Sequence, residues 1–178
     1  MKSIIFIIGQ TASGKTTYIK EQFLSKIAVP NYLDDPIKRT EGKIGNDRIL
    51  MFGHHKGAKR CEGTDELSWT ILPKLIEFIK NNINNYDTMI LEGDRINRAD
   101  FFDFIKTLNL PVELKFFSCS IKESMQRRLD TGSDPSETFV KTTKTKSEKM
   151  RLYAKELGFI VEEINTGEEK EEQQKTLF

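Results

Sequence analysis

The apolar pattern of the chain starts with an uninterrupted run from Ile4 to Ile8, which is made of β-branched and aromatic residues. Such a run is typical of a strand that is buried on both faces, so we predict a central strand at residues 3–8. After a short glycine-containing segment, residues 15–27 have helical spacing. This predicted helix has one apolar face, formed by Tyr18, Ile19, Phe23, Leu24 and Ile27.

The next part of the chain is less regular. We predict a second strand at residues 28–33, because the following Asp34-Asp35-Pro36 stops its continuation. Residues 37–63 are expected to form a long excursion around a short strand at 48–52, and long loops in compact domains are usually functional. A helix from an N-cap at Thr64 to about Asn81 would then carry Pro73 as a kink. Its residues spaced for burial are Trp69, Leu72, Leu75, Ile76 and Ile79.

Strands and helices alternate through the rest of the chain. Strands are predicted at residues 88–91, 112–118 and 159–164, and helices at 97–108, capped by Asn97, at 120–131 and at 136–157. This order predicts an α/β fold: a five-stranded parallel sheet with helices on both faces, a substrate excursion after strand 2 and a helical lid at about 120–150. The length of 178 residues suits one domain, placed at 1–165, with 166–178 as an acidic, flexible tail.

The net charge of +1 hides segments of opposite sign: residues 162–175 carry six glutamates against two lysines, whereas two other segments are basic. Residues 141–151 carry five basic side chains against one acid, and Lys56, Lys59 and Arg60 form a second basic group. These segments either meet an anionic ligand or form solvated surfaces.

Cys61 and Cys119 give no disulfide framework, and the first apolar run is too short for a signal peptide or a membrane span. We therefore expect a cytoplasmic protein without membrane partners.

One motif carries specific chemistry. The sequence Gly9-Gln-Thr-Ala-Ser-Gly14-Lys15-Thr16 fits the phosphate-binding pattern G-x-x-x-x-G-K-[ST], between a predicted strand and a predicted helix. Backbone N–H groups of such a loop surround phosphate oxygens at the positive end of the helix dipole. Lys15 is expected to reach the β- and γ-phosphates, Thr16 to ligate Mg²⁺ and Thr17 to contact the α-phosphate. The predicted ATP and Mg²⁺ site comprises Gly9, Thr11, Ala12, Ser13, Gly14, Lys15, Thr16 and Thr17.

The organisation around this motif resembles the small-molecule and nucleotide kinases of the phosphate-loop superfamily. The sequence has no Asn-Lys-x-Asp segment for reading guanine and no Asp-x-x-Gly switch after a strand, and it is too short to hold the sensor domain of a motor ATPase. Arg127 and Arg128, followed by Gly132 and a basic run to Lys149, are similar to the lid of nucleoside monophosphate kinases. The resemblance implies that one of these arginines neutralises the transferred phosphoryl group. The alternative is a pair of arginines on a solvated helix surface.

Acids at two strand ends extend the resemblance. Glu92-Gly93-Asp94-Arg95 resembles the acidic-arginine signature of thymidylate and deoxynucleoside kinases. This implies that Glu92 helps to hold magnesium, that Asp94 takes the proton of the acceptor and that Arg95 binds an acceptor phosphate. A loop salt bridge is the alternative. Asp34 and Asp35 stand where several such kinases carry an acceptor-binding acid, although Asp-Asp-Pro also forms turns.

The segment of residues 54–69 is similar to a Gly-Thr-Asp-x-Leu-Ser segment of phage-encoded kinases, among them the 5-hydroxymethyluridine DNA kinases. Phe139-Val-Lys141 and Thr145-Lys146 resemble their lid. The resemblance implies Asp65 as a base and Trp69 or Phe52 as a stacking residue. If the acceptor is DNA, we expect Lys56, Lys59, Arg60 and the basic run from Lys141 to Arg151 to contact its phosphates. Alternatively, Asp65 only starts a helix and Trp69 is a core residue, which the helical spacing favours.

His54 and His55 lack a third ligand at metal spacing, so no metal is predicted beyond nucleotide-bound magnesium, and we expect a solvated histidine pair.

The leading functional prediction is a kinase that transfers the γ-phosphate of ATP to a nucleotide-type acceptor, with Asp35, Asp65 or Asp94 as base. The acceptor is a hydroxyl on modified DNA or a free deoxynucleoside monophosphate, and near-neutral charge counts against extended DNA binding. A non-kinase ATPase or nucleotide-binding module is the competing class.

Overall fold

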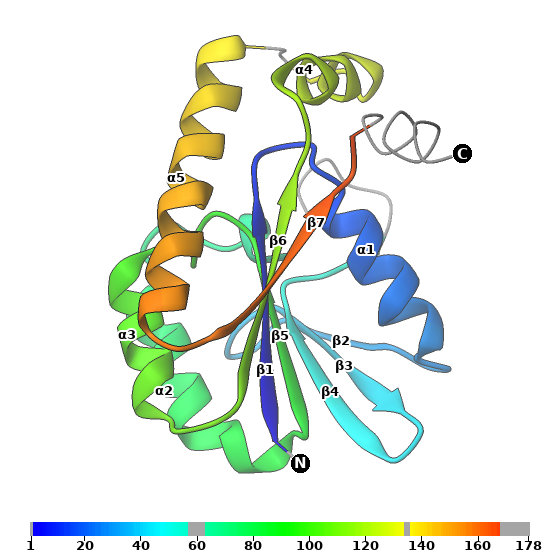
Figure 1. Ribbon diagram of the computed structural model, residues 1–178. Coiled ribbons are helices and arrows are strands. Elements are labelled where there is room, and N and C mark those ends of the chain that lie inside the picture. Colours follow the sequence, from blue (N-terminus) through cyan, green and yellow to red (C-terminus); the bar gives the residue numbers. More distant parts are fainter. Residues whose placement is uncertain (1, 57–62, 134–135, 168–178) are drawn as a thin grey trace, which may run out of the picture.

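The fold is built on one mixed sheet of seven strands. The computed structural model describes residues 2–56, 63–133 and 136–167 of the chain (Figure 1). The strand order is β2-β3-β4-β5-β1-β6-β7. Five neighbouring strands run parallel, and two are added antiparallel at the β4 edge. Their bounds are Ser3–Gly9 for β1, Asn31–Leu33 for β2, Arg39–Ile44 for β3, Asp47–Phe52 for β4, Thr88–Glu92 for β5, Val112–Ser118 for β6 and Ile160–Asn165 for β7.

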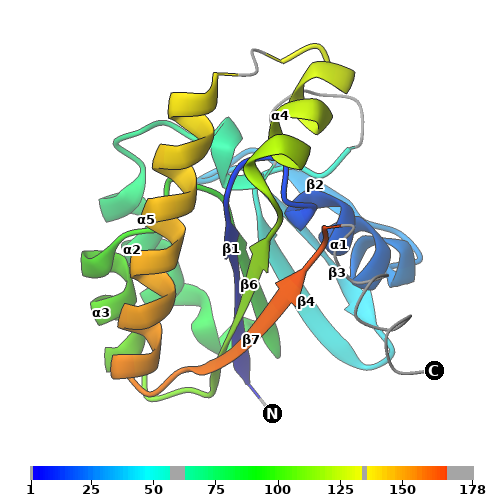
Figure 2. The ribbon, with the colours of Figure 1, turned by 45° about the horizontal axis from the view of Figure 1, so that its top comes forward.

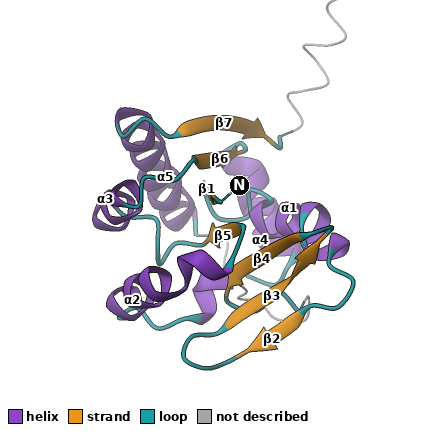
Figure 3. Cartoon of the chain, turned by 90° about the horizontal axis from the view of Figure 1, so that it is seen from below, coloured by secondary structure: helices purple, strands orange, loops and turns teal. Residues whose placement is uncertain are grey.

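Helices cover both faces of this sheet. The α-helices are α1 (Lys15–Gln22), α2 (Leu72–Asn82), α3 (Ala99–Thr107), α4 (Ile121–Asp130) and α5 (Glu137–Glu156), with single 3₁₀ turns at Leu24–Lys26, Gly63–Glu66 and Ile83–Asn85. Seen along the sheet, α2, α3 and α5 lie on one face and α1 on the other (Figure 3). Helix α4 lies beyond the carboxyl end of β6 (Figure 2). Within the described ranges, no helix combines the length and apolar character needed to cross a bilayer.

The central strand β1 explains this layering. Ile4, Phe6 and Ile8 point into the larger apolar core beneath α2, α3 and α5, whereas Ile7 points into the smaller core beneath α1. All four side chains are at most 1% exposed, as the period of two along a strand requires when both faces are covered. The prediction of a central strand with helices on both faces is confirmed.

The predicted sheet is wrong in its strand membership. The short strand predicted at 48–52 is confirmed as β4, but it is one of the five parallel strands, and residues 39–44 form the strand β3 of an antiparallel hairpin with it rather than part of a loop. The segment predicted as the second parallel strand supplies only the three-residue edge strand β2, which pairs antiparallel with β3. The sheet of the described residues therefore has seven strands and is mixed. Residues 53–56 of the predicted excursion follow β4 without regular structure, and residues 57–62 lie outside the described residues.

The helix predicted from Thr64 is also wrong at its start. Thr64 lies in the 3₁₀ turn Gly63–Glu66, and α2 begins only at Leu72. Pro73 therefore stands in the first turn, where the missing N–H has no helical partner to lose, and it causes no kink. Likewise Arg98, not Asn97, is the N-cap of α3. The predicted start of α4 is confirmed, because Ser120 and Glu123 form a reciprocal capping box.

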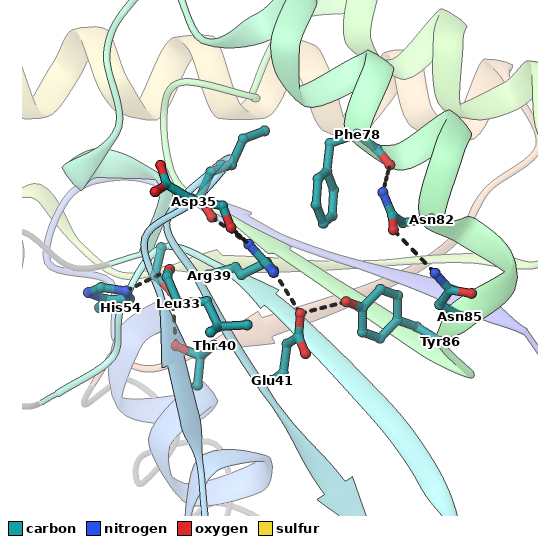
Figure 4. A network of polar contacts seen from close by, with 12 residues as sticks. Leu33, Asp35, Arg39, Thr40, Glu41, His54, Phe78, Asn82, Asn85 and Tyr86 are labelled. Atoms are coloured by element: carbon teal, nitrogen blue, oxygen red, sulfur yellow. Dashed lines mark hydrogen bonds and ion pairs between the residues drawn. The ribbon is translucent and has the colours of Figure 1, made fainter.

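A polar network joins the β3–β4 hairpin to the rest of the domain (Figure 4). The Tyr86 hydroxyl donates to Glu41 Oε1 over 2.6 Å, and Arg39 Nε donates to the same oxygen over 2.7 Å. The guanidinium of Arg39 also lies over the ring of Phe78 in α2, 5.2 Å from its centroid. The added strands are thus tied to α2 and to the segment before β5.

This network predicts a stability change at high pH. Burial, followed by the hydrogen bond to Glu41 and the charge of Glu41, raises the pKa of Tyr86 from 10.0 to about 12. The folded protein therefore keeps the phenol proton that the unfolded chain releases, so this group stabilises the fold below pH 10 and its contribution disappears as the pH rises towards 12. Urea unfolding at several pH values from 9 upward should show a smaller loss of stability for Tyr86→Phe than for the wild type. If the free energy of unfolding fell equally with pH in both proteins, the raised pKa of Tyr86 would be contradicted.

A close backbone approach fixes the chain after β4. Gly53 has φ 79°, and a Cβ atom there would lie 1.8 Å from the carbonyl oxygen of Gly63. We expect Gly53→Ala to lower the free energy of unfolding by about 2–5 kcal/mol, because both backbone strain and a backbone clash result. The matched control is Gly45→Ala in the β3–β4 turn, where φ is 60° but no atom lies within 4 Å of the added Cβ. For Gly45→Ala, denaturant unfolding should show that the free energy of unfolding falls by only about 1 kcal/mol.

Candidate functional site

Residues 9–16, here called the P-loop, connect β1 to α1 at the carboxyl edge of the sheet (Figure 1). Gly14 is the N-cap of α1 with φ 91°, a conformation that glycine adopts without strain. No side chain caps the helix, and its first turn contains no acid. The free N–H groups and the helix dipole therefore leave a place that suits an anion.

Lys15 spans the mouth of this loop. Its Nζ donates to the carbonyl oxygens of Gly9 over 3.0 Å and of Gln10 over 2.8 Å. An ammonium group bonded to carbonyl oxygens at a loop mouth is well placed to exchange them for phosphate oxygens, which carry more charge. The position of Lys15 thus fits the role predicted for it.

Both lid helices hold the outer part of the P-loop, and Thr11 is the point of contact. The Ser124 hydroxyl of α4 donates to the Thr11 carbonyl over 2.7 Å, and Arg128 donates to Thr11 Oγ1 over 2.9 Å. The backbone N–H of Thr11 donates to Thr143 Oγ1 of α5 over 3.2 Å. The conformation of the loop is therefore coupled to α4 and α5.

Arg127 connects the P-loop to the end of β7. It donates to the Ala12 carbonyl over 3.3 Å, and to the hydroxyl and carbonyl of Thr166 over 3.1 and 2.7 Å. Thr166 in turn donates to the Ser13 carbonyl over 3.0 Å. Contacts of the fold thus reach one residue past the predicted boundary at 165, while residues 168–178 of the expected tail lie outside the described residues.

Two cavities meet at the P-loop. The larger one, of about 960 Å³, lies on the side of α1 and α4, and the smaller one, of about 220 Å³, lies on the side of β5 and α5. Thr11, Ala12, Lys15 and Thr16 line both of them. The larger cavity is also lined by Ser13, Gly14, Thr17, Arg127, Arg128 and Thr166. The P-loop is therefore a wall shared by a large and a small cavity.

The wall of the smaller cavity opposite the P-loop is acidic. Asp65, Glu92 and Asp94 line it together with Lys15 and Thr16, so we call it the acid cavity. Glu92 ends β5, which pairs directly with β1, and it is 4% exposed. A carboxylate and the Thr16 hydroxyl in one cavity are oxygen donors of the kind that Mg²⁺ prefers. This set fits the predicted magnesium site.

Hydrogen bonds fix the other two acids. The Thr64 hydroxyl donates to the carbonyl of Glu92, which docks the 3₁₀ turn on the end of β5. Asp65 Oδ1 then accepts the backbone N–H of Asp94 over 3.0 Å. Asp94 forms an ion pair of 2.8 Å with Lys146 of α5. The structure thus brings together the two segments that sequence analysis considered separately, and Asp65 is no first-turn residue of an α-helix.

Four predicted site residues do not line either cavity. Asp35 is exposed beside the β2 edge, where its carbonyl accepts from Arg39 (Figure 4), so its position does not support a role as base. Lys141 is exposed and paired with Glu137 in α5. Arg95 and Trp69 stack on each other, with 3.3 Å between the guanidinium carbon and the centroid of the indole ring. Lys59 and Arg60 lie outside the described residues.

Two expectations about aromatic and histidine side chains are wrong. Trp69 is 68% exposed and precedes α2, so it is not a core residue, whereas Phe52 is 1% exposed and belongs to the core. His54 and His55 are 5% and 1% exposed rather than solvated. His54 lies 3.1 Å from the Leu33 carbonyl (Figure 4). No group of three or more metal-ligating side chains suited to an ion occurs in the described part of the chain.

Sequence reasoning missed several residues of the site. Ser124, Thr143 and Thr166 contact the P-loop only because distant helices and strands converge there, and their local sequence carries no signal of it. Asn97 was predicted only as a helix cap, yet it lines the acid cavity. The available signal was its place in the segment that connects the carboxyl end of β5 to α3, because such segments form the binding edge of an α/β sheet.

Comparison with known proteins adds little to this geometry. No protein-family model matches the sequence, and no curated protein matches it. Among solved structures, the chain is similar to the crystal structure of a probable GTP-binding protein, EngB. The two share 17% sequence identity over 92% of this chain and 88% of that chain, with a TM-score of 0.40. A likeness at this TM-score carries no argument about the ligand.

Proposed function

We propose that this protein is a kinase that transfers the γ-phosphate of ATP to a neutral hydroxyl group of a nucleotide-type acceptor. The observation that carries the proposal is the P-loop as a shared wall between a large cavity and a small acidic one. Phosphoryl transfer depends on positioning the donor, the acceptor and the compensating charges. In this arrangement the donor occupies the large cavity and the acceptor the acid cavity, with the transferred group at Lys15.

The volumes of the cavities support this assignment. A cavity of about 960 Å³ falls at the upper end of the range for small-molecule sites, which suits a nucleoside triphosphate. The acid cavity, at about 220 Å³, is below that range but exceeds the roughly 150 Å³ that holds a benzene ring. It therefore suits one ring or one hydroxymethyl group, while the remainder of the acceptor stays outside.

The charges of the acid cavity favour a hydroxyl over a phosphate as the accepting group. Three carboxylates line it, against the single cation Lys15 among the described lining residues. A phosphomonoester with close to two negative charges would be repelled, because like charges in a partly enclosed site are costly. A neutral hydroxyl avoids this repulsion and supplies a proton for a carboxylate to accept.

The hydrogen bonds support Asp65 as the general base. Asp94 is engaged by Lys146, and Glu92 is deeply buried at the strand end beside the P-loop, which suits a metal-binding role. Asp65 is oriented by the Asp94 N–H through one oxygen, so its other oxygen is available for the acceptor. The Asp65 carboxylate takes the hydroxyl proton as the new O–P bond forms and the bond to the departing ADP oxygen breaks. Magnesium held by Thr16 and Glu92 would supply charge neutralisation at the transferred group.

The acceptor class follows from what lies beside the acid cavity. Trp69 is largely exposed, and its partner Arg95 directly follows Asp94 in the chain. An exposed indole and a guanidinium plane are suited to stack on a nucleobase next to the reacting ring. Together with the resemblance to 5-hydroxymethyluridine DNA kinases, this makes the hydroxymethyl group of 5-hydroxymethyluridine, free or in DNA, the first acceptor to test.

The test incubates the protein with γ-labelled ATP or GTP, magnesium and single acceptors. The acceptors are thymidine monophosphate, 5-hydroxymethyl-2′-deoxyuridine and oligonucleotides with and without that base. Label on a hydroxymethyl group supports the proposal. Label on the monophosphate would favour the deoxynucleotide kinase alternative, and hydrolysis without transfer to any acceptor would favour an ATPase.

A further inference from the structure

Asn97 is a buried polar residue of the acid cavity to which the reaction described so far assigns no task. It lies between the end of β5 and the start of α3, lines the cavity and is 3% exposed. Its Nδ2 donates to the Ser147 hydroxyl of α5 over 3.3 Å, and Ser147 is itself 1% exposed. Its Oδ1 is buried and has no hydrogen-bond partner among the described residues.

Such a group is costly in an empty site. A buried carbonyl oxygen without a partner destabilises a fold, and a leucine of similar size would avoid that cost. Nearly all buried polar atoms in native proteins are paired, so an exception at a cavity wall points to a partner that arrives with a ligand. The hydrogen bond from Nδ2 to the Ser147 hydroxyl holds the amide in one orientation, in which Oδ1 is left to accept a hydrogen bond from a ligand.

We propose that Asn97 is a specificity residue that accepts a hydrogen bond from an N–H or O–H group on the acceptor ring. The inference rests on the proposed function, since it assumes that the acceptor occupies the acid cavity. For a 5-hydroxymethyluracil ring the donor is the ring N3–H, an edge that enzymes acting on extruded bases read with hydrogen bonds. The bond orients the ring so that its hydroxymethyl group faces Asp65 and Lys15.

The nucleotide donor does not explain the orientation of Asn97. Asn97 does not line the large cavity, and phosphate oxygens at neutral pH accept hydrogen bonds rather than donate them. The Asn97 Oδ1 and a phosphate oxygen are both acceptors, so they cannot form a hydrogen bond with each other. An acceptor substrate with a donor group satisfies the Asn97 oxygen, whereas a phosphate does not.

The experiment is a two-by-two comparison of enzyme and acceptor. Wild type and Asn97→Leu are each assayed with an oligonucleotide containing 5-hydroxymethyl-2′-deoxyuridine and with its N3-methyl derivative. We expect kcat/KM for the unmodified acceptor to fall about 10- to 100-fold in Asn97→Leu, because the ring loses its hydrogen bond, and KM for ATP to stay unchanged. Wild type should lose a similar factor on the methylated acceptor, and the variant should discriminate little between the two.

The outcomes separate the inference from the proposed function. If wild type transfers no phosphate to any acceptor, the proposed function fails. If wild type transfers phosphate but treats both acceptors alike, Asn97 does not read a donor on this ring, and the inference is overturned even if the variant fails to fold. Asn81→Leu, at an exposed position near the end of α2, is the matched control and should behave as wild type.

Discussion

Lys15→Ala is expected to lower kcat/KM for phosphoryl transfer by about 10²–10³-fold. The Lys15 ammonium closes the mouth of the P-loop through the Gly9 and Gln10 carbonyls and lies on the wall shared by both cavities. Among the described residues it is the one cation that lines both cavities, and removing one positioned donor of a developing charge costs about 10²–10³-fold. Initial rates with labelled ATP and the best acceptor measure the effect.

Lys122→Ala is the matched control for this change. Lys122 is an exposed lysine of α4, so its removal alters the net charge equally without touching either cavity. It should keep wild-type rates. Transfer at near wild-type rates by Lys15→Ala would mean that phosphates are bound elsewhere, and the donor site would have to be abandoned together with the proposed function.

Asp65→Asn should lower kcat by about 10²–10⁴-fold while KM for ATP stays nearly constant. Asparagine keeps an oxygen that can accept the Asp94 N–H, so the 3.0 Å contact and the docking of the turn on β5 are preserved. Only the ability to take a proton is lost. Steady-state kinetics with both substrates varied, and circular dichroism to confirm an unchanged fold, would measure this.

The same measurements on Asp94→Asn and Asp47→Asn complete the set. Asp94 is paired with Lys146, so its loss should mainly disturb acceptor binding. Asp47, exposed at the start of β4, should have no effect. A larger loss of kcat in Asp94→Asn than in Asp65→Asn would transfer the role of general base to Asp94.

The local parts of the fold could be predicted from sequence. The buried run of β1, the glycines of the P-loop and the Ser120 cap of α4 each depend on neighbours a few residues away. Their physical causes are burial on both faces, positive φ and capping of free N–H groups, and each depends on residues that are close together in the sequence. The P-loop and the elements on either side of it could therefore be predicted from short segments of the sequence.

The β3–β4 hairpin could have been found as well. Its two strands are joined by Gly45-Asn46, a two-residue turn signal of the kind that selects hairpins, with Gly45 at φ 60°. The prediction failed because residues 39–44 contain Glu41, Gly42 and Lys43 and lack an apolar alternation. The strand is stabilised instead by pairing with β4 and by the contacts of Glu41 with Arg39 and Tyr86.

The acid cavity was beyond the reach of sequence alone. Asp65 and Asp94 are 29 residues apart in the chain, and their contact depends on the Thr64 hydroxyl docking against the end of β5. The helical spacing of Trp69 with Leu72 and Leu75 suggested a longer helix, but the 3₁₀ turn and the segment up to Leu72 override that periodicity. Tertiary contacts therefore decide which acidic side chains come together in the cavity.

Under the proposed function, the P-loop would also link the binding of the two substrates thermodynamically. Thr11 borders both cavities and is bonded to α5 through Thr143, and α5 contributes Phe139 and Thr143 to the acid cavity. A nucleotide that reorganises Thr11 would change the free energy of acceptor binding. By reciprocity, the acceptor would change the affinity for the nucleotide by the same factor. Affinities measured for each substrate alone would then describe a different state of the protein from the ternary complex in which transfer occurs.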